Sequence, residues 1–403
     1  MFLDLLLRRN PTFLAAAAAL HQSGEIPANT TVLDLDAVGR NTELLAAESR
    51  RLGLTPFAMT KQIGRNPDTS GVIRAHGIDA AVGVDLECAV AAAAGGLRVG
   101  HVGHLVQVPR HSVDDAASLR PDYWTVFSLD GARNVGAASV RAGRTQRVLA
   151  RIARDGDRFY RGHEGGMPAQ DIVAMADAID AIDGLEFAGV TSFPASLFDP
   201  ESAVVRATAN LATLTDAKAA LERAGRSEVE LNAPGTTSTA MLRMLADAGA
   251  TQVEPGHGLT GTTPWHAVED LVEEPAVAYV TEVSHLWHGE AFVFGGGLYV
   301  DPVLGRAPTQ ALVIPHGCGL ADATRVDVEM PAPEAIDYYA TIPASGRIAP
   351  GDTVLMGFRP QVFVTRSLTA GIADVQGTPT ARTPWAANGS RQMRAADVTP
   401  KES

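Results

Sequence analysis

The chain has 403 residues, a formal net charge of −13 at pH 7, 46% hydrophobic and 20% charged residues. This composition is typical of a soluble globular protein, and no apolar run approaches the ~20 residues that a membrane span needs. The negative charge argues against sequence-independent binding to nucleic acid or to an anionic membrane. Two cysteines, Cys88 and Cys318, are too few for a disulfide framework and fit a reducing compartment. We therefore expect a cytoplasmic protein whose partners are small molecules and copies of itself.

The first residues, MFLDLLLRRNPTFLAAAAAL, are apolar enough to suggest a signal peptide. Asp4 lies inside the apolar stretch, however, and Arg8 and Arg9 follow it, which reverses the charge order of a signal peptide. We expect residues 1–28 to form an amphipathic helical extension that covers the barrel or a partner subunit.

Strand-like and helix-like segments alternate from residue 31 to about residue 255, which is typical of βαβ units and predicts a parallel sheet. About 225 residues of such repeats fit a closed eight-stranded barrel better than an open sheet. We assign residues 29–268 to a (β/α)8 TIM-type barrel. Nine strands are predicted, so one lies outside the barrel or is not a strand: TVLDLD, TPFAMT, DAAVGV, RVGHVGH, WTVFS, QRVLARIA, LEFAGVTS, VELNA and TQVEP.

The sequence after Glu273 has a different character. Strand-like runs such as VAYVTEVSHLW, TQALVIPH and GDTVLMGF are joined by glycine and proline turns, with little helical periodicity. Residues 269–382 are therefore predicted to form a second, mainly antiparallel β-domain, in agreement with a chain too long for one core. Residues 383–403 are polar and without pattern, and we expect a flexible tail.

Lys61 directly follows the apolar strand TPFAMT and precedes the turn GRNP. The carboxyl ends of barrel strands are where barrel enzymes hold their reactive groups. A lysine partly desolvated at this position has a lowered pKa, which Schiff-base chemistry requires. The alternative is an ordinary surface lysine.

The segment TVLDLDAVGRNTELLAAESRRLGLTPFAMTK resembles the opening strand, helix and lysine-bearing strand of the fold-type III pyridoxal-phosphate enzymes. These include alanine racemase, the ornithine and diaminopimelate decarboxylases, D-threonine aldolase and D-serine dehydratase. MTKQIGRNP, TSFPAS and VEPGHGLTGT are most similar to the YhfX-type branch. The resemblance covers roughly residues 31–370. It implies pyridoxal 5′-phosphate bound to Lys61, and a homodimer with shared active sites.

The run NAPGTTSTAM, residues 232–241, lies between a predicted strand and a predicted helix. Backbone amides at a helix N-terminus, with hydroxyl groups beside them, can hold a phosphate. The resemblance implies that this run is the phosphate loop, and a plain helix cap is the alternative. The predicted cofactor contacts, besides Lys61 and Glu254, are Ser192, Asn232, Thr236, Thr237, Ser238, Gly256, His257 and Gly258.

The segment VEPGHGLTGT places Glu254 at the end of the last barrel strand, before a glycine-rich loop. In the family that it resembles, this strand end contacts the pyridine nitrogen of the cofactor and the loop covers the phosphate. Alanine racemase has an arginine at the matching position, whereas the decarboxylases have a glutamate in an EPG motif, as here. An acid beside the ring nitrogen favours the protonated ring, which is the stronger electron sink. The alternative is a rim glutamate paired with a basic group.

The segment GCGLAD, residues 317–322, resembles the decarboxylase segment whose cysteine reaches the active site of the neighbouring subunit. Cys318 is therefore the candidate for a second acid/base group, opposite Lys61, and a buried apolar cysteine is the alternative. His316 and Cys318 also have the spacing of the zinc pair of the D-serine dehydratase type. Their position does not match that pair, so we predict no metal.

Two positions depart from alanine racemase. The tyrosine that the racemase uses as its second base aligns with Phe294, and Tyr299 follows five positions later. The ring-packing histidine of relatives is replaced by Phe193. Candidate contacts to a substrate carboxylate or a phosphate, with solvated surface positions as the alternative, are Arg65, Arg158, Arg161 and His163.

The resemblance implies an amino-acid racemase or epimerase that acts at the α-carbon through a Schiff base and a carbanion. Lys61 and Cys318 are the groups expected on the two faces of the α-carbon, and Glu254 is the expected partner of the ring nitrogen. A decarboxylase or aldolase is the first alternative, because the same carboxylate stabilises any carbanion at this carbon. A non-catalytic pyridoxal-phosphate protein is the second, and the β-domain argues against it.

Overall fold

A computed structural model of the chain describes residues 1–295, 309–332, 336–359, 361–362 and 365–392. The residues group into two compact units. The barrel unit comprises Ala37–Thr60 and Ser70–Glu274, and the β-domain unit comprises Met1–Asp36, Lys61–Thr69 and the chain from Pro275 onward. No helix within the described ranges has both the length and the apolar character that crossing a membrane requires.

The barrel unit is built on a ten-stranded parallel sheet, of which nine strands lie in the order β2-β13-β12-β9-β7-β6-β5-β4-β3 and β8 (Met167–Pro168) pairs with β7 outside this order. Only Phe57 separates β2 from β3, and the two pair with β13 and β4 respectively. The first and last strands of this order are thus one chain segment, and the parallel sheet closes on itself as predicted. The strands are β2 (Thr55–Pro56), β3 (Ala58–Met59), β4 (Ala80–Gly83), β5 (Arg98–Val102), β6 (Tyr123–Val126), β7 (Gln146–Ala153), β9 (Leu185–Thr191), β12 (Glu230–Asn232) and β13 (Gln252–Val253).

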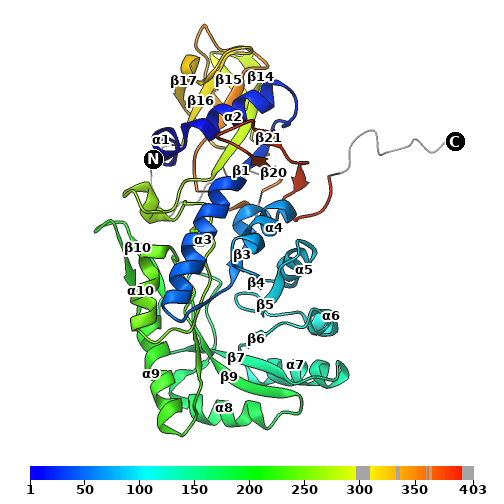
Figure 1. Cartoon of the computed structure of the whole chain (residues 1–403), viewed down its shortest axis with the longest axis vertical. Helices are drawn as coiled ribbons and strands as arrows, with labels where there is room; N and C mark the ends of the chain where they lie inside the picture. Colours follow the sequence, from blue (N-terminus) through cyan, green and yellow to red (C-terminus); the bar gives the residue numbers. More distant parts are fainter. Residues whose placement is uncertain (296–308, 333–335, 360, 363–364, 393–403) are drawn as a thin grey trace, which may run out of the picture. The chain divides into compact units, whose positions relative to one another are not determined.

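Helices alternate with the barrel strands along the chain and lie outside them, and the first of these helices, α3, follows β1 (Thr30–Asp34) (Figure 1). Side chains at strand ends begin several of these helices. Asp85 accepts a hydrogen bond from the Cys88 amide at the start of α5, and Ser128 accepts one from Gly131 at the start of α7. The helices are α3 (Leu35–Arg51), α4 (Pro67–Ala75), α5 (Leu86–Ala94), α6 (Val113–Ser118), α7 (Leu129–Arg141), α8 (Ile172–Asp180), α9 (Ala209–Arg223) and α10 (Thr239–Asp247).

The β-domain unit is a mainly antiparallel sheet in the order β17-β16-β19-β14-β1-β20-β21. Its central strand β1 comes from the start of the chain and pairs antiparallel with β14 and parallel with β20. Strand β1 corresponds to the predicted strand TVLDLD. It is the one of the nine predicted strands that lies outside the barrel, in the β-domain sheet. The strands are β1 (Thr30–Asp34), β14 (Val277–Trp287), β15 (Glu290–Phe294), β16 (Gln310–Ile314), β17 (Thr324–Asp327), β18 (Tyr339–Pro343), β19 (Thr353–Met356), β20 (Leu368–Ala373) and β21 (Thr380–Ala381).

The N-terminal extension forms two helices, α1 (Phe2–Arg9) and α2 (Pro11–Gln22). Phe13 and Leu14 of α2 are fully buried in one cluster with Val32 of β1 and Leu355 of β19. The helices therefore pack on the sheet of their own unit, and cover for a partner subunit stays a prediction. The apolar character of α2 explains this position, because such a helix is stable only where most of its surface is buried.

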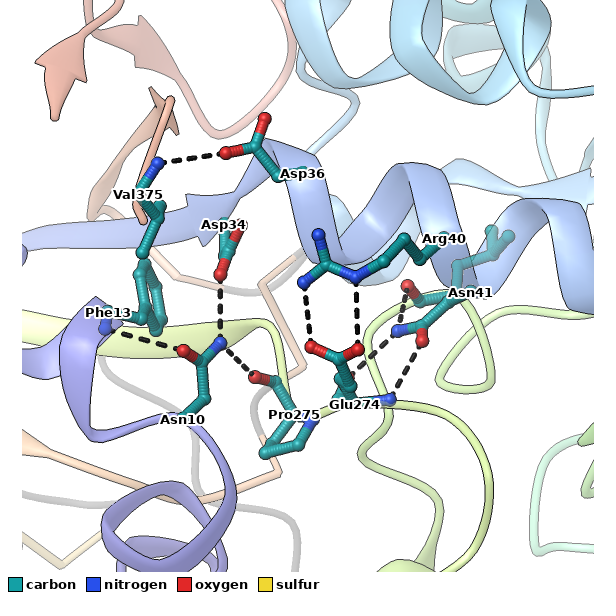
Figure 2. A network of polar contacts seen from close by, with 10 residues as sticks. Asn10, Phe13, Asp34, Asp36, Arg40, Asn41, Glu274, Pro275 and Val375 are labelled. Atoms are coloured by element: carbon teal, nitrogen blue, oxygen red, sulfur yellow. Dashed lines mark hydrogen bonds and ion pairs between the residues drawn. The ribbon is translucent and has the colours of Figure 1, made fainter. Parts of the chain in front are cut away.

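Polar contacts hold the chain where it passes between the units (Figure 2). In the β-domain unit, Asn10 donates to Asp34 Oδ2 at 2.8 Å and to the carbonyl of Pro275 at 3.0 Å. In the barrel unit, Arg40 makes a bidentate ion pair with Glu274, at 3.0 and 2.7 Å. Glu274 and Pro275 are the residues between which the chain changes from the barrel unit to the β-domain unit, and each is held by a contact within its own unit.

Part of the predicted flexible tail has regular structure. Strand β22 (Trp385–Ala386) pairs antiparallel with β20. The indole Nε1 of Trp385 donates to Asp68 Oδ2 at 2.9 Å. The sequence did not indicate this strand, because a single tryptophan within a polar run carries no periodic signal.

Candidate active site

Glu254 follows β13 at the edge where the parallel barrel strands end. The residue is 3% exposed. Its Oε1 accepts a hydrogen bond from Asn232 Nδ2 at 3.1 Å, and Asn232 Oδ1 accepts one from Thr191 Oγ1 at 2.7 Å. Thr191 ends β9 and Asn232 ends β12, so three neighbouring strands hold the carboxylate in position.

Two buried histidines complete the surroundings of Glu254. His101 Nδ1 lies 2.8 Å from Glu254 Oε1, and His101 Nε2 lies 2.6 Å from Thr125 Oγ1 on β6. His104 follows β5, and its Nε2 lies 3.2 Å from Glu254 Oε2. Side chains from β5 and β6 thus meet those of β9, β12 and β13 at the carboxyl end of the barrel.

The pKa of Glu254 lies below the ordinary value for a glutamate. Burial acts in the other direction, because it disfavours the charged form and raises the pKa. The positive charge that His104 can carry and the hydrogen bonds from His101 and Asn232 outweigh burial. Glu254 is therefore a carboxylate at neutral pH.

The ligand atoms of His101, His104 and Glu254 lie within 4.8 Å of one another, and no other such group of three occurs in the described part of the chain. Both ring nitrogens of His101 and the Oε1 atom of Glu254 are already engaged in direct hydrogen bonds. The group is thus a hydrogen-bonded cluster, and we assign no metal to it.

Aromatic rings lie next to this cluster. Phe193, which follows β9, contacts His104 edge-on with ring centroids 5.9 Å apart. It also lies 5.8 Å from the ring of Tyr160 and 6.1 Å from that of His163. The half-buried His163 therefore lies among the rings next to the Glu254 cluster, and its contact with a substrate stays a prediction.

Three more residues that the sequence predicted as cofactor or substrate contacts lie in the loops after β7 and β9. Ser192 is buried, and its Oγ accepts a hydrogen bond from Asn210 Nδ2 at 3.2 Å. Asn210 also bonds both backbone groups of Arg158, at 2.9 and 3.1 Å, while the side chains of Arg158 and Arg161 are exposed. The structure thus fixes the backbone at Arg158 and leaves its guanidinium at the surface.

The segments predicted to bind phosphate pack tightly on one another. The amide of Thr236 donates to the carbonyl of Ser196 at 3.0 Å, which joins the loop after β12 to the chain after β9. A Cβ added to Gly258 would lie 2.5 Å from the carbonyl oxygen of Thr237, so the glycine-rich loop approaches the same segment too closely for a side chain. Gly256 and His257 are buried beside it.

Ser238 is the N-cap residue of α10, and its buried Oγ has no hydrogen-bond partner. An unsatisfied hydroxyl at a helix N-terminus suits an anion with many acceptor oxygens. The neighbouring amide of Thr239 is already bonded to the carboxylate of Glu273 at 2.6 Å. A phosphate at this position would therefore use Ser238 and the amides before it.

Lys61 lies in the 3-10 helix η1 (Thr60–Ile63), which begins directly after β3, and its side chain is half-buried. The chain contains three lysines, Lys61, Lys218 and Lys401. Lys218 lies in α9, where its Nζ donates to the carbonyl of Val229 at 2.7 Å. Lys401 lies outside the described residues.

The remaining predicted residues lie in the β-domain unit. Arg65 is 8% exposed and donates to the carbonyl of Ala387 at 3.3 Å. Cys318 is exposed in the loop after β16, and Gln22 of α2 holds this loop through the Gly317 amide at 2.9 Å and the Cys318 carbonyl at 3.1 Å.

Of the two residues compared with the second base of alanine racemase, Phe294 is described in the structure and Tyr299 is not. Phe294 ends β15, and its carbonyl accepts hydrogen bonds from Tyr279 and Thr281. Tyr299 lies outside the described residues.

Sequence reasoning missed His101 and His104 as site residues. Both occur in RVGHVGH, which was assigned only as a strand. Two histidines three positions apart at the carboxyl end of an apolar barrel strand were the available signal.

Family comparisons cover nearly the whole chain. The family description "Alanine racemase, N-terminal domain" matches residues 33–264, and "YhfX-like, C-terminal domain" matches residues 278–381. The uncharacterized protein YhfX of Escherichia coli strain K12 is 38% identical over 375 residues, which cover 92% of this chain and 95% of YhfX.

Solved structures share the fold at low identity. A D-threonine aldolase from Filomicrobium marinum has a TM-score of 0.65 and 20% identity, with coverage of 90% of this chain and 95% of the aldolase. An alanine racemase from Clostridium difficile 630 in complex with cycloserine has a TM-score of 0.60 and 13% identity, with coverage of 90% of this chain and 99% of the racemase. Dehydratase and decarboxylase structures have the same fold.

The fold and the matches define a fold-type III pyridoxal-phosphate enzyme. The chain belongs to the alanine-racemase-like family and, within it, to the YhfX type. The family implies pyridoxal 5′-phosphate as cofactor. The buried carboxylate of Glu254 and the unsatisfied hydroxyl of Ser238 fit this group, because it offers a ring nitrogen and a phosphate.

Proposed function

We propose that the chain is a pyridoxal-phosphate-dependent racemase or epimerase that acts at the α-carbon of an amino acid. The observation that carries the proposal is the buried, ionised Glu254 at the end of β13. When bound, the cofactor delocalises the electron pair left on the α-carbon after bond cleavage. A carboxylate beside the ring nitrogen keeps a proton on that nitrogen and so strengthens the effect.

The roles of the chain's own residues follow from their chemistry. Lys61 would hold the cofactor through its ε-amino group, and the hydroxyl of Ser238 with the amides of Thr237 and Ser238 would hold the phosphate. The freed amine of Lys61 would then accept or return a proton on one face of the α-carbon. The thiol of the partner subunit's Cys318 would do so on the other face, which gives inversion.

Assembly forms part of the proposal. Cys318 is exposed on its own chain. An exposed thiol can serve as an acid/base group only where another surface covers it and fixes its position. We therefore propose a homodimer with shared active sites and an amino acid as substrate. The cytoplasm remains the proposed location, because the chain has only two cysteines.

A lyase is the second candidate. Structures named as an aldolase, a dehydratase and a decarboxylase share this fold, and Glu254 supports loss of any substituent at the α-carbon. A racemase needs a proton-transferring group on each face of the α-carbon, whereas a decarboxylase needs one group to supply the proton that replaces carbon dioxide.

Product analysis tests the proposal. The purified protein with added pyridoxal 5′-phosphate is incubated with both enantiomers of the amino acids, with Lys61→Ala as negative control. Chiral chromatography should show inversion without loss of mass. Release of carbon dioxide or of an aldehyde would show that the protein is a lyase and would contradict the racemase proposal. Absence of any product, and of deuterium uptake at the α-carbon from heavy water, would leave a non-catalytic cofactor protein.

A further inference from the structure

We infer that His101 is a positioning residue for Glu254, and that Thr125 fixes the tautomer in which His101 does so. The inference rests on the proposed function, because Glu254 matters to catalysis only as the partner of the cofactor ring nitrogen. It adds two residues, on β5 and β6, that act through Glu254.

The direction of the hydrogen bond follows from the charge of Glu254. An ionised carboxylate only accepts hydrogen bonds, so His101 Nδ1, 2.8 Å from Oε1, carries the proton. Nε2 of the same ring faces Thr125 Oγ1 at 2.6 Å. A hydroxyl can donate to an unprotonated nitrogen, and this contact favours the tautomer with its proton on Nδ1.

The site leaves the imidazole of His101 little freedom. His101 and Thr125 are both completely buried. The ring lies 6.3 Å from that of Phe57 and 5.3 Å from that of His104, centroid to centroid. A ring held on both nitrogens and next to two other rings fixes the orientation of the carboxylate, as an outer partner orients a metal ligand or a catalytic histidine.

The charged and titratable groups that face Glu254 from the packed strands are His101 and His104, while Asn232 contributes a neutral amide. Asn232 binds the same oxygen as His101 and remains when His101 is replaced. Removal of His101 should therefore leave Glu254 buried and partly hydrogen-bonded, with weaker stabilisation of its charge.

Nuclear magnetic resonance of the full-length, cofactor-free chain tests the hydrogen bond directly. With 15N-labelled histidine, the His101 signal is the one missing from His101→Gln. We expect a proton on Nδ1, and we expect the spectrum of this ring to change in Glu254→Gln and in Thr125→Val. A ring protonated only on Nε2, or an unchanged His101 spectrum in folded Thr125→Val, would overturn the inference.

Carboxyl 13C labelling of glutamate tests the consequence. The Glu254 signal, assigned by its loss in Glu254→Gln, should titrate at a higher pH in His101→Gln than in the wild type. Tyr123→Phe is the matched control, because it removes another buried hydroxyl of β6, bonded at 2.6 Å to Glu230. An unchanged titration of Glu254 in His101→Gln would overturn the inference.

These spectra need no turnover, so they separate this inference from the proposed function. With cofactor and a substrate, His101→Gln should slow α-proton exchange at least about tenfold, with cofactor affinity changed less than about threefold. The expected NMR changes in a protein that turns over no amino acid would support the positioning role and count against the proposed function.

Discussion

At the scale of single residues, Glu254 links stability to pH. Its pKa is lower in the folded chain than in an unfolded one, so the unfolded chain binds the proton more tightly. The resulting stabilisation is complete above the ordinary glutamate value of 4.5 and decreases as the pH falls below it.

Glu254→Gln in the cofactor-free protein should therefore be less stable than wild type at pH 7, with the difference shrinking below about pH 4.5. Urea unfolding at several pH values measures this. Glu87→Gln, an exposed carboxylate of α5, should change little at any pH. A difference that is independent of pH would mean that Glu254 is not held ionised.

Replacement of Cys318 tests the proposal that its thiol is the second acid/base group. Cys318→Ala should lower kcat about 100-fold or more, with little change in cofactor affinity, if the thiol transfers a proton. The control is Cys88→Ala, because Cys88 is 1% exposed in the core of the barrel unit and its loss should affect stability only. Equal kcat values for Cys318→Ala and wild type would assign the second face to another group.

At the scale of secondary-structure elements, helix α2 should contribute strongly to the stability of the β-domain unit. Leu14 is fully buried against its sheet, so Leu14→Ala should cost about 2–5 kcal/mol of unfolding free energy. Leu44→Ala, at a leucine that is 40% exposed, should cost much less. Equal losses in urea unfolding would contradict the packing of α2 on the sheet.

Strand identity was predictable from sequence, but sheet membership was not. All nine predicted strands exist, because apolar runs bounded by turns specify extended chain locally. Nothing in TVLDLD distinguishes a barrel strand from the central strand of the β-domain, since both are buried on two faces. Only pairing with β14 and β20, far along the chain, decides it.

The same limit applies to the candidate site. Glu254 and the residues of the loop after β12 stood out through motifs, each within one segment. The contact between His101 and Glu254 joins residues 153 positions apart. No local pattern reports such a contact, because closure of the barrel creates it.

At the scale of the whole molecule, the proposed homodimer predicts complementation. Lys61→Ala and Cys318→Ala subunits are each inactive in their own homodimers, but a mixed dimer would contain one site with both residues intact. Mixing the two variants should restore activity toward about one quarter of wild type, the statistical limit for random exchange with one intact site of two in half of the dimers. No recovery after subunit exchange verified by mass spectrometry would contradict a shared site.

The central claim is that the chain carries pyridoxal 5′-phosphate on Lys61, one of its three lysines. Borohydride reduction of the protein with bound cofactor, followed by peptide mass spectrometry, measures this directly. We predict a pyridoxyl group on Lys61 in wild type and in Lys218→Arg, and loss of both the label and the visible absorbance in Lys61→Ala. A label on Lys218 or Lys401 in wild type, or retained visible absorbance in Lys61→Ala, would contradict the account.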